Sequence, residues 1–98
     1  MYDIKKTENF EKWLIKLKDT KGKIAVARSI DKMQNGNFGD SRPIGEGLSE
    51  LRLTIGPGYR VYYMIKNKEI IILLNGGDKS KQQSDIKTAK QLAKEYKS

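Results

Sequence analysis

The sequence contains no cysteine and no histidine. Without cysteine the chain has no disulfide framework, no thiol nucleophile and none of the usual zinc ribbons. Without histidine it lacks the commonest general acid–base and the commonest metal ligand. Only carboxylates and carbonyls are left to hold a metal, and no acidic cluster occurs along the chain, so we expect neither a metal site nor a cofactor. Any catalysis must use Lys, Arg, Tyr, Asp, Glu, Ser or the backbone.

Long apolar runs are missing as well. The longest is "IIILL" at residues 70–74, far short of the roughly 20 residues that cross a bilayer. The first residues, "MYDIKKTENF", lack the apolar core of a signal peptide, so we expect a cytoplasmic protein that does not associate with membranes. The length of 98 residues fits a single domain spanning residues 1–98.

Acidic residues are few relative to basic ones, 12 against 20, which gives a net charge of +8. Basic domains of this size usually bind something acidic, such as nucleic acid, an anionic surface or an acidic partner protein. A lysine-rich surface that is merely solvated is the alternative.

The first third of the chain predicts a short strand at residues 2–6 followed by two helices. Thr7 is placed to cap the first helix, which extends to about residue 19. Its apolar residues recur at helical spacing: Phe10, Trp13, Leu14 and Leu17. Gly22 separates this helix from a second one at about residues 23–34. Residues 36–47 are rich in glycine and indicate an ordered loop.

From residue 48 the apolar period changes to two, which predicts strands at 48–55, 60–66 and from 69 onward. Matching the apolar faces across the Gly-Pro-Gly turn places Ile55 opposite Val61. The same register puts Arg52, Arg60 and Tyr62 together on the other face.

A second hairpin is expected to turn at "NK", residues 67–68, with Lys66 opposite Glu69. The side chains that this register places on the face of Val61 are Tyr63, Ile65, Ile70, Ile72 and Leu74. Ile71 and Leu73 then join the face of Arg60. Because this last strand is apolar on both sides, it is predicted to be central and covered on both faces.

The final element predicted is a helix from about Lys81, with Ser80 as its N-cap and Gln83 completing a capping box. Its narrow apolar stripe consists of Ile86, Ala89, Ala93 and Tyr96. The order is therefore β-α-α-β-β-β-α, an α+β fold. The helical hairpin packs on one face of an antiparallel sheet, and the last helix lies at an edge or on the other face.

Three motifs carry a resemblance to a known family. They are "ELR" at 50–52, "GPGYRVYY" at 56–63 and "LLNGGDKSKQQSDI" at 73–86, and the helix "FEKWLIKLKD" also fits. Together they resemble the phage-derived HigB-like "addiction module killer" branch of the RelE/ParE toxin superfamily. The resemblance extends over nearly the whole chain.

The resemblance implies the toxin of a type II toxin–antitoxin pair. RelE-like and HigB-like members cleave messenger RNA in the ribosomal A site, whereas ParE-like members share the fold but inhibit DNA gyrase without nuclease activity. The antitoxin of the HigB-like branch resembles a small helix-turn-helix repressor (HigA-like), and it binds operator DNA as a complex with the toxin. The expected partners are this antitoxin, the ribosome and messenger RNA.

Ribonuclease chemistry of this kind needs a base for the ribose 2′-hydroxyl, an acid for the leaving oxygen, and cations for the phosphate charge. Arg52 and Arg60 are the candidates for holding that charge. Lys79 follows the last strand, and in position it is similar to a basic residue of RelE-like nucleases, so it is expected to bind phosphate or donate a proton. Tyr62 is expected to stack on a base. The lysines expected to contact RNA phosphates are Lys81, Lys87, Lys90 and Lys94.

Structural roles are the alternatives for the same residues. Arg52 could form an ion pair with Glu50, and Arg60 could anchor the turn that precedes it. RelE-like nucleases carry a tyrosine or histidine shortly after the last core strand, but "DKSKQQSDI" has neither. Asp78, Asp85 or Lys79 would have to replace it, or the ribosome would supply the proton chemistry.

Three functions follow from these observations. The leading hypothesis is a ribosome-dependent messenger RNA endonuclease, followed by a ParE-like inhibitor of gyrase and by a basic RNA-binding accessory domain. An open groove on the Arg60 face favours the nuclease, whereas a face filled by the last helix favours the protein-binding toxin.

Overall fold

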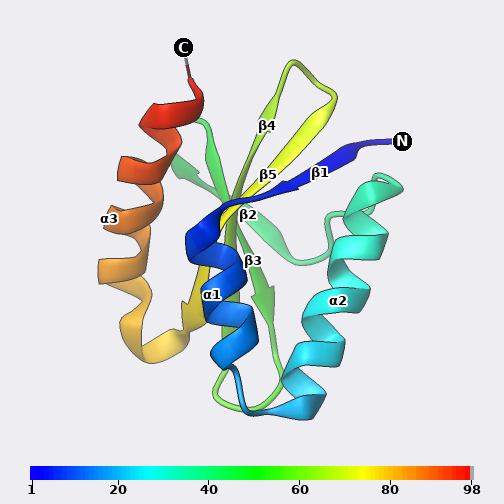
Figure 1. The fold of residues 1–98 in the computed structure, drawn as a ribbon, viewed down its shortest axis with the longest axis vertical. Helices are drawn as coiled ribbons and strands as arrows, with labels where there is room; N and C mark the ends of the chain where they lie inside the picture. Colours follow the sequence, from blue (N-terminus) through cyan, green and yellow to red (C-terminus); the bar gives the residue numbers. More distant parts are fainter. Residues whose placement is uncertain (98) are drawn as a thin grey trace.

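The computed structural model describes residues 1–97 and contains one five-stranded sheet. The strands are β1 (Asp3–Lys6), β2 (Ser41–Gly45), β3 (Leu48–Leu53), β4 (Tyr59–Lys66) and β5 (Ile70–Asp78). They lie in the order β1-β5-β4-β3-β2, and only β1, which runs beside β5, is paired in parallel (Figure 1).

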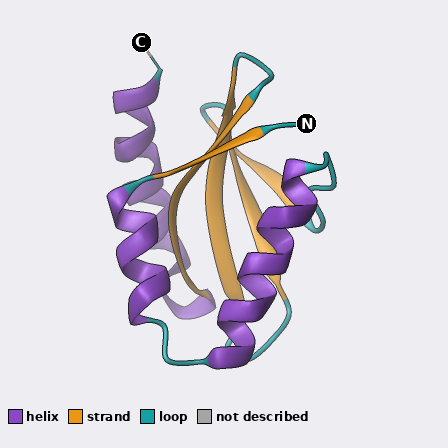
Figure 2. Cartoon of the chain, turned by 45° about the vertical axis from the view of Figure 1, so that its right-hand side comes forward, coloured by secondary structure: helices purple, strands orange, loops and turns teal. Residues whose placement is uncertain are grey.

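Helices cover both faces of this sheet. α1 (Glu8–Lys16) and α2 (Thr20–Gln34) lie on one face, and α3 (Gln82–Ala93) lies on the other, as Figure 2 shows. Two single 3-10 turns, η1 (Lys79–Lys81) and η2 (Lys94–Tyr96), flank α3. The predicted α+β class and the helical hairpin on one face are confirmed, and the last helix takes the opposite face. No helix within residues 1–97 is long and apolar enough to cross a membrane.

Side-chain caps explain where the first two helices begin. Thr7 accepts a hydrogen bond from the backbone N–H of Phe10, as predicted, and its own hydroxyl donates to the Leu74 carbonyl of β5. Asp19 caps α2 by accepting from the N–H of Gly22, so α2 starts before the glycine that was expected to precede it. Gly22 is needed there for space, because a Cβ would lie 2.6 Å from the Tyr59 ring.

Each face of the sheet has its own apolar core. The core under α1 and α2 is formed by Phe10, Val26, Ile30, Met33, Leu51, Val61, Tyr63, Ile71 and Leu73. The core under α3 is formed by Leu48, Tyr62, Met64, Ile72, Leu74, Ala89 and Ala93. The three interior strands β3, β4 and β5 contribute to both cores, so β5 is covered on both faces, as predicted.

The strand β2 was missed in the sequence. Residues 41–45 pair with β3 at the edge of the sheet, and the ladder is irregular between Pro43 and Gly45. Both an edge position and such an irregularity accommodate a proline, which has no N–H to donate. The segment does not alternate and contains both glycine and proline, so its composition favours a loop.

The predicted register of the first hairpin was wrong by four residues. Leu51, not Ile55, lies opposite Val61, because residues 54–58 form the turn, with Gly58 donating its N–H to the carbonyl of Ile55. An even shift keeps every side chain on its predicted face. Arg52 therefore lies on the same face as Arg60, directly opposite it.

The predicted register of the second hairpin was wrong by one residue, so the side chains of β5 lie on the opposite faces from those predicted. Lys66 pairs with Ile70 rather than Glu69, because Asn67 and Lys68 adopt left-handed backbone angles and Glu69 belongs to the turn. An odd shift exchanges the two sides of a strand. The residues that moved to the α1–α2 core are Ile71 and Leu73, and those that moved to the α3 core are Ile72 and Leu74.

The predicted capping box of the last helix is also absent. Asp78, rather than Ser80, acts as the cap, and it accepts the N–H of Ser80 at the start of η1. α3 then begins at Gln82 with no side-chain cap. Ser80 instead lies inside η1, where its hydroxyl donates to Asp78.

Tyr59 connects the helical hairpin to the Gly-Pro-Gly turn. Its hydroxyl donates to Asp19 Oδ2 at 2.8 Å, and its ring packs edge-on against Trp13. The bond from Tyr59 and the one from the Gly22 N–H both lower the pKa of Asp19. This carboxylate therefore stabilises the fold above the ordinary aspartate range and loses that effect as the pH falls through its lowered pKa.

We expect Tyr59→Phe to lower the urea midpoint of unfolding at neutral pH, because the Asp19 carboxylate loses its hydroxyl donor. The difference from wild type should shrink in acid, where Asp19 is protonated in both proteins. Tyr2→Phe, which removes a hydroxyl outside this contact, serves as the control. A difference that is equally large at neutral and acidic pH would contradict the assigned role of Asp19.

Candidate functional site

The two arginines on the α3 face are a like-charged cross-strand pair, which is unfavourable unless one charge is neutralised. Arg52 is the neutralised one. Its Nε and Nη2 donate to the two carboxylate oxygens of Asp40 at 3.1 and 3.2 Å. Arg52 therefore forms an ion pair, as the structural alternative predicted, but its partner is Asp40 and not Glu50.

Arg60 is the free member of the pair. Within residues 1–97 its guanidinium makes no ion pair, and its buried Nε has no hydrogen-bond partner. A buried donor without a partner costs about 1–3 kcal/mol. The group is thus available to bind an anion that reaches it from solvent.

Three further buried polar atoms near Arg60 have no partner in the described residues: the Tyr62 hydroxyl, Asn75 Oδ1 and Asp85 Oδ2. Asn75 lies opposite Tyr62 in the sheet and donates its Nδ2 to the Asp85 carbonyl at 3.0 Å. Asp85 Oδ2 lies so close over Gly77, which pairs with Arg60, that a Cβ there would be 2.0 Å away. The sheet and the first turns of α3 thus enclose a polar cluster.

Burial controls the ionisation of this cluster. It raises the pKa of Asp85, which the nearby charge of Lys81 partly offsets. It also raises the pKa of the Tyr62 hydroxyl, and the charges of Glu50 and Asp85 add to that effect, while Arg60 opposes it. Tyr62 therefore stays a neutral phenol, and Asp85 is the carboxyl of the site with a raised pKa.

Glu50 is the buried charge that sequence reasoning missed. Alternation placed it on a solvated face, but it is completely buried and accepts from Arg42 Nε at 3.1 Å and from Gln82 Nε2 at 2.8 Å. Gln82 is the first residue of α3, so this contact fixes the start of the helix on the sheet. The alternation of β3 could not show that a helix covers this face.

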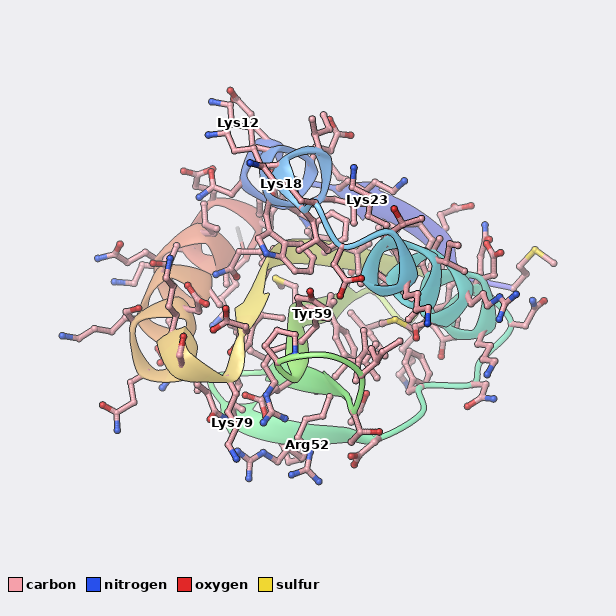
Figure 3. All side chains as sticks on the ribbon, turned by 90° about the horizontal axis from the view of Figure 1, so that it is seen from below. Lys12, Lys18, Lys23, Arg52, Tyr59 and Lys79 are labelled. Atoms are coloured by element: carbon pink, nitrogen blue, oxygen red, sulfur yellow. The ribbon has the colours of Figure 1, made fainter. Side chains whose placement is uncertain are left out.

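Lys79 lies where the sequence predicted, beside the first hairpin. A Cβ on Gly58 of the Gly-Pro-Gly turn would be 3.6 Å from the Lys79 Cβ. In Figure 3 the side chains of Lys79 and Arg52 extend from the same edge of the molecule, below Tyr59. An open pocket of about 720 Å³ continues from Lys79 along the start of α3, and its cationic lining is completed by Lys81 and Lys87.

The other predicted RNA contacts do not join this pocket. Lys90 lies farther along α3 and forms an ion pair with Glu46 at 3.4 Å, and Lys94 lies in η2 beyond the end of the helix. The prediction for Tyr62 was wrong, because its ring is completely buried under α3 and cannot stack on a base. The last helix thus fills the face over Tyr62 and Met64, while Arg52 and Arg60 stay partly exposed.

Residues 5–97 match the model of the family described as phage-derived protein Gp49-like (DUF891). The chain belongs to this family. An uncharacterized protein of Haemophilus influenzae is 49% identical over 92 residues, which are 94% of this chain and 93% of the relative.

The structure is similar to those of RelE proteins. The isolated Escherichia coli RelE toxin superposes with a TM-score of 0.67 at 12% identity, covering 89% of this chain and 98% of RelE. The toxin–antitoxin complex RelBE2 of Mycobacterium tuberculosis gives a TM-score of 0.57 at 21% identity, covering 80% of this chain and 98% of the matched chain. The Gp49-like chain therefore has the RelE fold, as the resemblance implied. Its assignment to the HigB-like branch stays a prediction.

Acidic side chains do not gather elsewhere into a metal site. Among residues 1–97, no group of three or more His, Cys, Asp or Glu side chains is placed to hold a metal ion. Any chemistry of the polar cluster under α3 would therefore be carried out by its arginine, tyrosine, amide and carboxyl groups.

We expect Asp85→Asn to be at least as stable as the wild type at neutral pH, because it removes a carboxyl whose charged form is disfavoured by burial. A raised folded-state pKa means that this aspartate stabilises the fold least above that pKa, so the advantage of the variant should vanish in acid. Urea unfolding at the two pH values measures the effect.

The matched control is Asp78→Asn. The hydroxyl and N–H of Ser80 lower the pKa of Asp78, so this variant should lose stability at neutral pH, in the opposite sense. If Asp85→Asn proved the less stable protein at neutral pH, the carboxylate would have a partner and the assigned environment would be wrong.

Proposed function

We propose that this chain is the toxin of a type II toxin–antitoxin pair and that it cleaves messenger RNA on the ribosome. The observation that carries the proposal is the unpaired guanidinium of Arg60 on the α3 face of the sheet, together with an open pocket lined by Lys79, Lys81 and Lys87 at the start of α3. The RelE fold and the net charge of +8 support it. Proteins with this fold include E. coli RelE, which is named a toxin.

The proposed chemistry is attack of a ribose 2′-hydroxyl on the adjacent phosphorus, with departure of the 5′-oxygen. The phosphate gains charge in the transition state, so preorganised cations stabilise that state more than the substrate. We assign this role to Arg60 and Lys79, and also to Arg52 once it has exchanged Asp40 for the phosphate.

Proton transfer is assigned to Asp85 rather than to Asp78. The pKa of Asp78 is lowered and its carboxylate is occupied by Ser80, so it is a poor acid. Asp85 has the raised pKa and an unpartnered oxygen. Its burial under α3 means that the first turns of the helix must shift before Asp85 can contact RNA.

A ParE-like inhibitor of gyrase is the second candidate, and one observation favours it. α3 fills most of the face that a nuclease would be expected to leave open, over Tyr62 and Met64. Such a toxin would bind its target as a protein surface and would not need Asp85 to exchange protons.

The proposed partner that neutralises the chain is a helix-turn-helix antitoxin of the HigA-like kind. RelE proteins of E. coli and M. tuberculosis have been crystallised with their antitoxins, which supports an equivalent protein partner here. Binding to operator DNA is proposed only for that complex, and the site of action is proposed to be the cytoplasm.

The test is induction of the wild-type chain and of Arg60→Ala in bacteria without an antitoxin, followed by mapping of messenger RNA 5′ ends. Wild type should arrest growth and produce new ends inside translated codons. Loss of one such transition-state contact typically costs about 10²–10³-fold in rate, so the variant should neither cut nor arrest. Arg28→Ala, an exposed arginine of α2, is the control and should behave like the wild type.

Other outcomes separate the alternatives. Growth arrest with intact messages and an SOS response would show a gyrase toxin and overturn the nuclease. No arrest by the wild type would overturn the toxin and leave a basic RNA-binding domain.

A further inference from the structure

A groove runs between α2 and the end of β3, and Arg52 and Asp40 line one end of it. Two pockets lie end to end in it. One, of about 300 Å³, is lined by Lys21, Ile24, Ala25, Arg28 and Ile55. The next, of about 210 Å³, follows both elements onward and includes Ser29 and Lys32 of α2 and Leu53 of β3. We name the two together the α2–β3 groove.

The floor of the groove is apolar. Ile24 is 47% exposed, which is unusual for an isoleucine in a helix that packs on a sheet. Ile55, Leu53 and Phe38 continue the apolar surface and are only partly buried. A contiguous exposed apolar strip of this kind marks a binding surface more often than a single exposed residue does.

The helical rim of the groove is cationic. Lys21, Arg28 and Lys32 line it, and none of the three forms an ion pair within the described residues. Asp40, the acidic residue of the groove, is already occupied by Arg52. The rim therefore carries uncompensated positive charge beside an apolar floor.

The length of the groove and the chemistry of its lining indicate which kind of partner would fit it. Lys21 to Lys32 spans eleven helical steps, about 16 Å at 1.5 Å per residue, which equals three turns of a partner helix. An amphipathic helix places apolar side chains in such a groove at i, i+3/i+4 and i+7, and its flanking carboxylates would meet the rim. An apolar floor disfavours a nucleic-acid strand, whose backbone needs polar contacts.

We propose that the α2–β3 groove binds an acidic amphipathic helix of the antitoxin. The identity of the partner rests on the proposed function, whereas the groove and its chemistry do not. Arg60 lines neither pocket, although Arg52 and Asp40 line one end of the groove. A helix seated in the groove would therefore contact Arg52 without itself covering Arg60.

The experiment measures binding of the proposed helix-turn-helix antitoxin to the purified chain by biolayer interferometry. Ile24→Gln and Arg28→Glu should each weaken binding by about tenfold or more, because a few central anchor residues carry most of the binding energy of an interface. Ile15→Gln, at an isoleucine of α1 that is 75% exposed, and Lys16→Glu are the matched controls and should bind as the wild type does. All four side chains are exposed or lie at the groove, and equal thermal melts would establish intact folding.

Two results would overturn the proposal. The first is unchanged binding by both groove variants, or no binding by the wild type. The second is loss of growth arrest by the groove variants without antitoxin while their binding to it is retained, which would assign the groove to the ribosome or nucleic acid. A wild-type chain that binds the proposed antitoxin through the groove but never arrests growth would overturn the proposed function and leave the groove proposal standing.

Discussion

The pairing of β4 with β5 is the constraint on which the rest of the structure depends. These two strands are buried on both faces, so a change in their register would move side chains between two different cores. The register shift between Tyr62 and Tyr63 inserts one extra residue of β5, Leu74, into the ladder. After that bulge Asn75 lies opposite Tyr62 and Gly77 lies opposite Arg60, which assembles the polar cluster.

The interior under α3 is more polar than a stable core requires. Glu50 is buried with two partners, yet four other buried polar atoms near it have none within the described residues. A fold optimised only for stability would replace such groups, because each costs free energy. Locally unfavourable arrangements of this kind gather at functional sites, where other contacts compensate for them. Here the apolar contacts of Ala89 and Ala93 hold the same helix down.

The sequence predicted where helices and strands occur better than it predicted how the strands pair and what covers each face of the sheet. Thr7 as a cap and the helical hairpin followed from local chemistry, and the shared face of Arg52 and Arg60 survived because an even error in register preserves alternation. The second hairpin failed because left-handed angles at Asn67 and Lys68 are a property of the turn that periodicity does not report. Tyr62 and Glu50 were misjudged for one reason: alternation tells which residues share a face, but not what covers it. Only the placement of α3 decides that.

Two consecutive glycines of β5 have a consequence for how the two helical layers are connected. A Cβ at Gly76 would lie 2.4 Å from the Trp13 ring of α1, and one at Gly77 would lie 2.0 Å from Asp85 of α3. Both helical layers therefore lie directly on the bare backbone of the same short stretch, which includes Gly77, the residue that pairs with Arg60. At this point the sheet separates α1 from α3 with backbone alone, so no side chain can be added at either glycine without displacing Trp13 on one side or Asp85 on the other.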